Sequence, residues 1–227
     1  MSKPQKILAI ALWIVAVVAM VGVLLLKTMS TGRNSSVAAA RGGSDIPGQI
    51  LPEPLAASAK DLPTLYDAPR FDLTNQDGQP FGNAQLQSHP WIADFIFTTC
   101  ASQCPIISSR MAGLQQQLPK EIKLVSFTVD PSHDTPAALT LYAAQYKADL
   151  KRWSFLTGDP PAVLAVIAGM KMGFQPADNG TSIIHSPYMV LVDGQGHVRG
   201  VYDSGSESKM TQLAHDASLL LSAATSP

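Results

Sequence analysis

The residues best suited to chemistry are two cysteines, Cys100 and Cys104, which stand four positions apart in a chain of 227 residues with no other cysteine. One pair is too few for a fold held together by several disulfides, so redox chemistry or metal binding is indicated. The residues between and around them include Thr, Ser, Gln and Pro. This polar setting argues against two cysteines that merely pack as small apolar side chains.

The Cys-x-x-x-Cys spacing allows two outcomes. The motif lies where a predicted strand ends and a predicted helix begins, and there the N–H groups and the dipole of the helix favour thiolate. The two sulfurs can close a disulfide if their Cα atoms lie within about 4.4–6.8 Å. They can also hold a soft metal ion such as Cu(I) or zinc. A structural zinc site usually needs four ligands, so this small set of ligands favours copper.

One histidine stands out as a third ligand. His185 comes shortly before a predicted strand that begins at Tyr188. In a thioredoxin-like sandwich, the loop before that strand faces the helix that bears the cysteines. The fold hypothesis therefore favours a ligand role for His185 over a loop histidine bonded to the backbone.

The other four histidines are assigned differently. We expect structural roles for three of them, which lie in a loop, after a turn and on a helix: His89, His197 and His215. His133 follows another predicted strand, so it can border the site together with Asp130. Asp134 is expected mainly to cap a helix.

Strand and helix patterns alternate from about Leu62 onward. The predicted order is a hairpin over 71–81, strands over 91–97, 122–129 and 153–156 that alternate with helices over 104–118, 134–146 and 160–170, a hairpin formed by 188–192 and 197–202, and a closing helix over 206–223. This order predicts the α/β class, with a mixed central sheet flanked by helices. A thioredoxin-like sandwich has this order, and other α/β folds share it.

The N-terminal region predicts a transmembrane helix. Ile7 to Leu26 is a run of twenty residues without a charge, and at about 1.5 Å per residue it spans roughly 30 Å, the thickness of a bilayer core. A cleaved signal peptide is the first alternative. Its apolar core would be about 7–15 residues, closely followed by a cleavage site, whereas the nearest candidate site here is Val37–Ala40. An uncleaved signal anchor is therefore favoured.

Three regions follow from these patterns. Residues 1–27 form a cytoplasmic tip and the anchor. Residues 28–61, rich in Pro, Ser and Ala, form a flexible tether. Residues 62–227 form the globular domain, which we expect on the non-cytoplasmic side of the membrane, the periplasm if the source is bacterial. The net charge of −1 gives no reason to expect a nucleic-acid partner.

Taken together, the motifs resemble the Sco/SenC family of copper metallochaperones. The matching pieces are the anchor, Phe71-Asp-Leu-Thr with Asp77-Gly78, Phe95-Ile-Phe-Thr-Thr-Cys-x-x-x-Cys-Pro105, Val129-Asp-Pro-x-x-Asp-Thr135 and His185-Ser186. The combination is specific even though each piece alone is weak. Three residues depart from the pattern of the family without removing a ligand: Ala101 where Pro is common, His133, and Pro187.

The resemblance implies a function and a site. It implies a thioredoxin fold that binds copper, as Cu(I) and also as Cu(II), through Cys100, Cys104 and His185. The protein would deliver copper to the dinuclear copper centre of cytochrome c oxidase, or prepare that centre. The implied partners are the copper-bearing oxidase subunit, and another copper chaperone or a thioredoxin-like reductase.

Two enzymatic functions are alternatives to the prediction of a copper chaperone that is not an enzyme. A thiol–disulfide oxidoreductase would use Cys100 and Cys104 as a redox pair on cysteines of a copper-site client or of other extracytoplasmic proteins. It would not need His185. A thiol peroxidase would need rapid peroxide consumption by one cysteine, and it is the weaker alternative.

Overall fold

The structure is a computed structural model that describes residues 58–172, 175–176, 183–184 and 187–224. Its helices and strands, in chain order, are η1 (Ala59–Asp61), β1 (Tyr66–Asp67), β2 (Asp72–Asn75), β3 (Pro80–Gly82), η2 (Asn83–Leu86), β4 (Trp91–Ile96), α2 (Cys104–Gln117), β5 (Lys123–Thr128), α3 (Pro136–Gln145), β6 (Trp153–Thr157), α4 (Pro160–Gly169), β7 (Gln175–Pro176), β8 (Ile183–Ile184), β9 (Tyr188–Val192), β10 (His197–Asp203) and α5 (Glu207–Ala224). The predicted order of the main elements is confirmed.

The main sheet is mixed, as the sequence predicts. Its strand order is β1-β10-β9-β4-β5-β6-β2-β3. β4, β5 and β6 are parallel neighbours, whereas β9 pairs with β4, and β2 with β6, in antiparallel fashion. The C-terminal ends of β4 and β5 therefore lie at the same end of the sheet as the first residue of β9.

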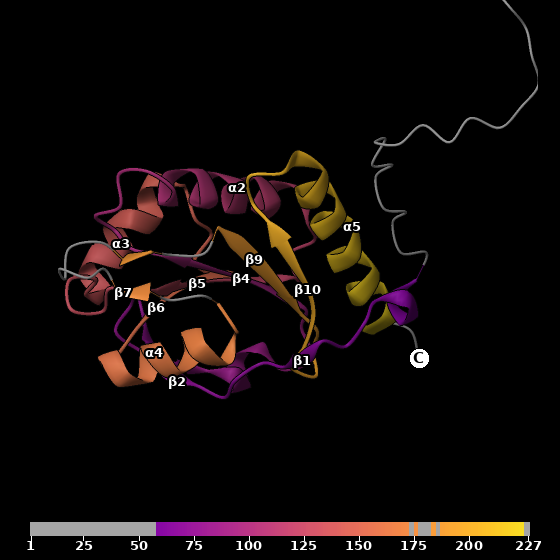
Figure 1. The fold of residues 1–227 in the computed structure, drawn as a ribbon, viewed down its shortest axis with the longest axis horizontal. Helices are drawn as coiled ribbons and strands as arrows, with labels where there is room; N and C mark the ends of the chain where they lie inside the picture. Colours follow the sequence, from indigo (N-terminus) through magenta and orange to yellow (C-terminus); the bar gives the residue numbers. More distant parts are fainter. Residues whose placement is uncertain (1–57, 173–174, 177–182, 185–186, 225–227) are drawn as a thin grey trace, which may run out of the picture. The chain divides into compact units, whose positions relative to one another are not determined.

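Helices cover both faces of this sheet (Figure 1). α2, α3 and α5 pack on one face, where Ile92 and Ile96 of β4 join their apolar residues. α4 packs on the other face, against Trp91, Ala93 and Phe95 of the same strand. Alternate residues of β4 thus enter different layers of the core, as strand geometry requires. The result is a thioredoxin-like α/β sandwich.

Proline fixes where three of the helices begin. Pro105, Pro136 and Pro160 lie in the first turns of α2, α3 and α4, where the missing N–H of proline costs nothing and its fixed φ suits the helix. The start of α2 matters most for function, because it fixes Cys104 as the first helical residue.

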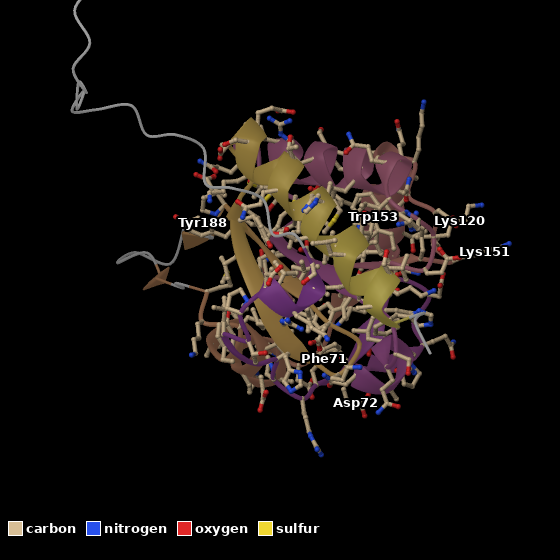
Figure 2. The ribbon with its side chains drawn as sticks, turned by 90° about the vertical axis from the view of Figure 1, so that its right-hand side faces the viewer. Phe71, Asp72, Lys120, Lys151, Trp153 and Tyr188 are labelled. Carbon is tan, nitrogen blue, oxygen red and sulfur yellow. The ribbon has the colours of Figure 1, made fainter. Side chains whose placement is uncertain are left out.

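The two ends of the sheet carry different surfaces. In Figure 2, Tyr188, the first residue of β9, lies at one end of the domain, and Lys120 and Lys151, which precede β5 and β6, lie at the other. The end near Tyr188 is the one at which β4 delivers the cysteines.

The predicted anchor over 7–26 and most of the predicted tether lie outside the described residues. Among the residues that are described, no helix is long and apolar enough to cross a membrane.

Candidate functional site

The two cysteines lie side by side at the junction of β4 and α2. Cys100 is half-buried in the loop over 97–103, and Cys104 is buried in the first turn of α2. Both are thiols, with no disulfide between them. The main-chain N–H of Cys104 donates a hydrogen bond to the Cys100 sulfur at 3.3 Å. The Cys100 sulfur thus lies against the first turn of the helix that begins at Cys104.

Their surroundings make the two thiols chemically unequal. Burial alone would raise the pKa of Cys100, but hydrogen bonds from the Cys104 thiol and from the main-chain N–H groups of Cys104, Ser102 and Gln103 outweigh burial and lower it. Burial strongly raises the pKa of Cys104, and its hydrogen bond to Cys100 raises it further. Cys100 is thus the thiol that ionises first and the better nucleophile or first metal ligand.

A buried carboxyl lies on the same face of the sheet as α2. The Asp94 side chain is fully buried, and neither of its oxygens has a hydrogen-bond partner in the described part of the chain. Burial raises its pKa to about 7, against opposing effects of Ser126 and of its own backbone. A negative charge on Asp94 also raises the pKa of Cys104.

Asp134 does not cap α3, contrary to the prediction. The N-cap is Thr135, whose hydroxyl accepts the N–H of Ala138 at 3.3 Å. The Asp134 carboxylate is buried and turns to the sheet edge instead. There it accepts the hydroxyl of Thr98 and the hydroxyl of Thr128, each at 2.5 Å, and the N–H of Thr98 at 3.2 Å. No sequence pattern indicates this role, because Asp before Thr-Pro is typical of a helix start.

His133 and Asp130 form an exposed pair after β5. Nδ1 of His133 lies 2.8 Å from a carboxylate oxygen of Asp130. This hydrogen bond raises the pKa of His133. The N–H of Asp130 donates to the Thr128 hydroxyl at 2.9 Å, so the pair adjoins the Asp134 network, as expected for residues that border the site.

His185 lies outside the described residues. It lies between β8, which ends at Ile184, and β9, which begins at Tyr188 at the end of the sheet where β4 ends. Among the described residues, no three His, Cys, Asp or Glu side chains gather closely enough to hold a metal ion. Cys100 and Cys104 are thus the part of the predicted ligand set that the described residues contain.

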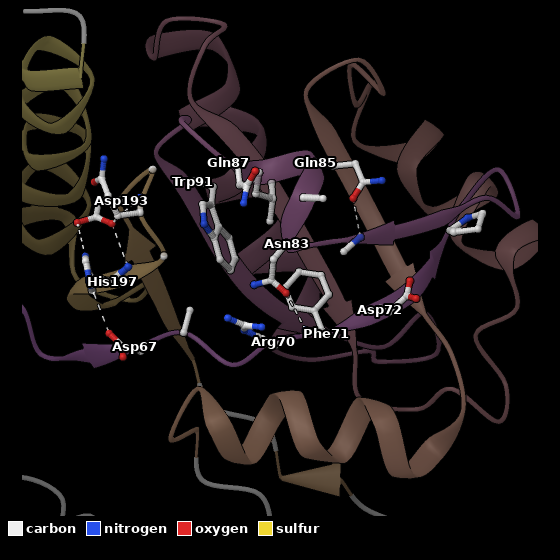
Figure 3. A pocket seen from close by; sticks show the side chains of 18 residues that line it. Asp67, Arg70, Phe71, Asp72, Asn83, Gln85, Gln87, Trp91, Asp193 and His197 are labelled. Atoms are coloured by element: carbon white, nitrogen blue, oxygen red, sulfur yellow. Dashed lines mark hydrogen bonds and ion pairs between the residues drawn. The ribbon is translucent and has the colours of Figure 1, made fainter.

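A cavity of about 730 Å³ lies at the other end of the sheet (Figure 3). Its walls include Trp91, the first residue of β4, and the turn after β9, and neither cysteine lines it. His197 lies here, with Nδ1 at 3.3 Å from Asp193 and Nε2 at 3.7 Å from Asp67. His197 thus contacts two carboxylates near this cavity, which is separate from the cysteine site.

Comparison with known proteins agrees with this geometry. A protein of Bacillus subtilis named SCO1 protein homolog is 31% identical over 68% of this chain and 82% of its own length. A protein of Stutzerimonas stutzeri named for copper binding is 34% identical over 61% of this chain and 70% of its own length.

Two solved structures have the same fold. A SCO1/SenC family lipoprotein of Bacillus anthracis matches with a TM-score of 0.63 and 32% identity, over 68% of this chain and 95% of its own. BsSco, described as a member of the Sco family of cytochrome c oxidase assembly proteins with a disulfide switch, matches with a TM-score of 0.61 and 30% identity, over 71% of this chain and 95% of its own. A family model described as SCO1/SenC matches residues 61–220. The chain therefore belongs to the SCO1/SenC family.

Proposed function

We propose that this protein is a copper metallochaperone that holds copper through Cys100, Cys104 and His185. It would deliver copper to the dinuclear copper site of cytochrome c oxidase, or prepare that site. The observation that carries the proposal is the hydrogen bond from the Cys104 N–H to the Cys100 sulfur at 3.3 Å. It indicates two sulfurs on one side of a helix start, one of which ionises readily.

The ligand chemistry supports copper. Thiolates are soft ligands that select Cu(I) or zinc over hard cations, and a structural zinc site usually takes four protein ligands. The described residues supply two thiol sulfurs and no cluster of three His, Cys, Asp or Glu side chains. A copper ion held by two sulfurs and one imidazole fits this inventory, and the copper-binding name of the Stutzerimonas relative agrees with it.

The topology supports His185 as the third ligand. β9 is antiparallel to β4 and begins three residues after His185. β9 therefore begins at the end of the sheet at which β4 leads into the loop of Cys100 and Cys104.

The inequality of the two cysteines supports thiol–disulfide exchange as a second function. The Cys100 thiolate would attack a client disulfide, form a mixed disulfide and release one client thiolate. Cys104 would then attack the Cys100 sulfur and release the second client thiol. The client is reduced, and the Cys100–Cys104 pair is oxidised. The Sco neighbour described with a disulfide switch agrees with such chemistry.

We further propose that residues 1–27 anchor the chain in the membrane, residues 28–61 tether it, and residues 62–227 act on the non-cytoplasmic side. The apolar run over 7–26 is the basis for the anchor. The family relative from Bacillus anthracis, described as a lipoprotein, agrees with attachment to a membrane.

Metal analysis and absorption spectroscopy of the reduced full-length protein test the main function. The wild type should retain about one copper per chain, bound through thiolates. The Cys100→Ser/Cys104→Ser variant should retain none, and unchanged binding in this variant would disprove the proposal. His185→Ala should lower copper affinity clearly, whereas the control His197→Ala, at the other end of the sheet, should leave it unchanged.

The same variants separate the two functions. A protein that acts only by thiol–disulfide exchange should reduce a client disulfide equally well with and without His185. A metallochaperone should lose copper affinity in His185→Ala, because a ligand is gone.

A further inference from the structure

A buried carboxylate joins the loop that carries Cys100 to the rigid sheet. We propose that Asp134 is a positioning residue for the metal site: it holds Thr98, and through Thr98 it fixes the loop over 97–103. This inference deepens the proposed function and rests on it. The hydrogen bonds between this carboxylate and the loop come from Thr98, so its effect on Cys100 passes through the backbone of the loop.

Three donors converge on this carboxylate. The Thr98 hydroxyl and the Thr128 hydroxyl each donate at 2.5 Å, and the Thr98 N–H donates at 3.2 Å to both oxygens. The side chain of Asp134 is fully buried, and a buried charge is tolerated only when such donors satisfy it. Asp134 thus binds the donors of Thr98 and Thr128 and does not cap α3.

The position of Thr98 determines the position of Cys100. Thr98 comes two residues before Cys100, in a tight turn in which the Cys100 N–H donates to the carbonyl oxygen of Phe97 at 3.2 Å. This turn places the Cys100 sulfur within hydrogen-bonding distance of the Cys104 N–H. A shift of Thr98 would therefore move the sulfur away from the donors that stabilise its thiolate.

Thr128, the third residue of this hydrogen-bond network, lies in the central part of the sheet. Thr128 is the last residue of β5 and lies in register with Ile96 of β4, in the centre of the sheet. The carboxylate accepts one hydroxyl from this fixed strand and two donors from the loop. Asp134 is also held by its own main-chain N–H, which donates to the carbonyl oxygen of Asp130 at 2.9 Å, so it restrains the loop that carries Cys100 even when the Thr128 hydroxyl is missing.

The chain offers a matched pair of variants. Thr98→Val and Thr128→Val each remove one hydroxyl that donates to the same carboxylate, but only Thr98 lies on the cysteine loop. If Asp134 positions the loop, Thr98→Val and Asp134→Ala should affect the site, and Thr128→Val should not. Thr98→Val also decides the question if Asp134→Ala does not fold.

The first readout is amide hydrogen exchange of the reduced, metal-free, full-length protein. Exchange in the segment 98–103 should be at least about tenfold faster in Asp134→Ala and Thr98→Val than in the wild type, because a local restraint is lost. Exchange in α5 should not change. Wild-type exchange of this segment in both variants, or an equal acceleration in Thr128→Val, would overturn the inference.

The second readout is copper binding by competition, together with the thiolate-to-copper charge-transfer spectrum. Removal of groups that orient ligands typically costs about 10–100-fold in metal affinity, so Asp134→Ala and Thr98→Val should weaken copper binding about tenfold and shift the band. Thr128→Val should keep the wild-type spectrum, and a shift there equal to that of Thr98→Val would count against positioning. If the wild type binds no copper, the proposed function falls, while the exchange experiment still decides the role of Asp134.

Discussion

The main-chain N–H of Cys104 lies 3.3 Å from the sulfur of Cys100 and donates a hydrogen bond to it. This contact exists because α2 begins at Cys104, so the N–H of this residue has no acceptor within the helix. Further N–H groups from Ser102 and Gln103 act on the same sulfur. The N-terminus of α2, which begins at Cys104, thereby stabilises the thiolate of Cys100.

The first prediction concerns the reactivity of the two thiols. In the reduced, metal-free protein at pH 7, Cys100 should react with iodoacetamide at least about tenfold faster than Cys104. The reason is that its pKa is lowered while burial raises that of Cys104. Mass spectrometry of digested samples at timed intervals measures both rates. In Cys104→Ser the N–H donor remains, so Cys100 should stay reactive; equal rates at the two cysteines in the wild type would contradict this account.

The second prediction concerns Asp94 and pH. Its pKa is 3.8 in an unfolded chain and about 7 in the folded protein, so the folded state binds the proton more tightly. The contribution of Asp94 to stability is therefore fully present below about pH 4 and is lost as the pH rises to about 7. At 1.36 kcal/mol per pKa unit, the loss is roughly 4 kcal/mol as an upper bound.

Asp94→Asn removes this titration. The variant should be more stable than the wild type at pH 8, and the difference should shrink toward pH 4, as measured by urea unfolding at each pH. Asp216→Asn is the matched control, because Asp216 is also buried but accepts the Tyr202 hydroxyl at 2.7 Å. That variant should be less stable than the wild type at pH 8. A constant difference between Asp94→Asn and the wild type across this range would refute the assignment.

The elements around the site could be predicted from sequence because each has a local signal. A short, mostly apolar run predicted β4, apolar residues at helical spacing predicted α2, and Pro105 indicated the start of the helix. Asp94 also had a signal, a single charged residue in the otherwise apolar run over 91–97, although its burial was not predicted. These signals arise from residues close together in the chain, because the spacing of residues along a helix or strand determines which face each side chain lies on.

Other features depend on contacts between distant residues. β1 pairs with β10, more than a hundred residues away, and two residues carry no strand pattern of their own. Asp134 looked like a helix cap because its sequence context fits one, and only the approach of Thr98 from another loop gives it a different role. Local patterns cannot decide between two hydrogen-bonding roles when one partner is far away in the chain.

The third prediction concerns Arg152, a guanidinium buried at the end of the sheet opposite the cysteines. It donates to four main-chain carbonyl oxygens around the end of α2 and the start of β5, those of Gln115, Leu118, Pro119 and Ile122. Arg152→Met leaves these acceptors without a charged donor, and the free energy of unfolding should fall by about 2–4 kcal/mol. Denaturant unfolding measures the change.

Copper binding should distinguish this effect from damage to the site. Arg152→Met should bind copper with wild-type affinity at temperatures where it is folded, because the cysteines lie at the other end of the sheet. Lys151→Met, the exposed neighbour, is the control and should change stability by less than about 0.5 kcal/mol. Equal stability losses at 151 and 152 would contradict the structural role of Arg152.

The last prediction concerns Arg199, which holds the segment where the chain enters the domain. Its guanidinium donates to the carbonyl oxygens of Ala59, Leu62 and Pro63 at 2.9, 2.7 and 3.0 Å. It also pairs with Asp193 at 2.9 Å. Arg199 is thus the main polar link between residues 59–63 and the hairpin of β9 and β10. Lysine has one ammonium group and no planar fork, so it cannot reproduce this set of contacts.

Both Arg199→Lys and Arg199→Ala should therefore loosen residues 58–66. Hydrogen exchange and limited proteolysis of this segment should accelerate. Stability should fall by about 1–3 kcal/mol, because partly buried and exposed carbonyl acceptors lose hydrogen bonds from a charged donor. Arg70→Ala is the control, because Arg70 is exposed on the nearby cavity wall and should leave the segment unchanged. Unaltered exchange of residues 58–66 in Arg199→Ala would mean that Leu62, buried in the core beside α5, is sufficient to hold the entry segment in place.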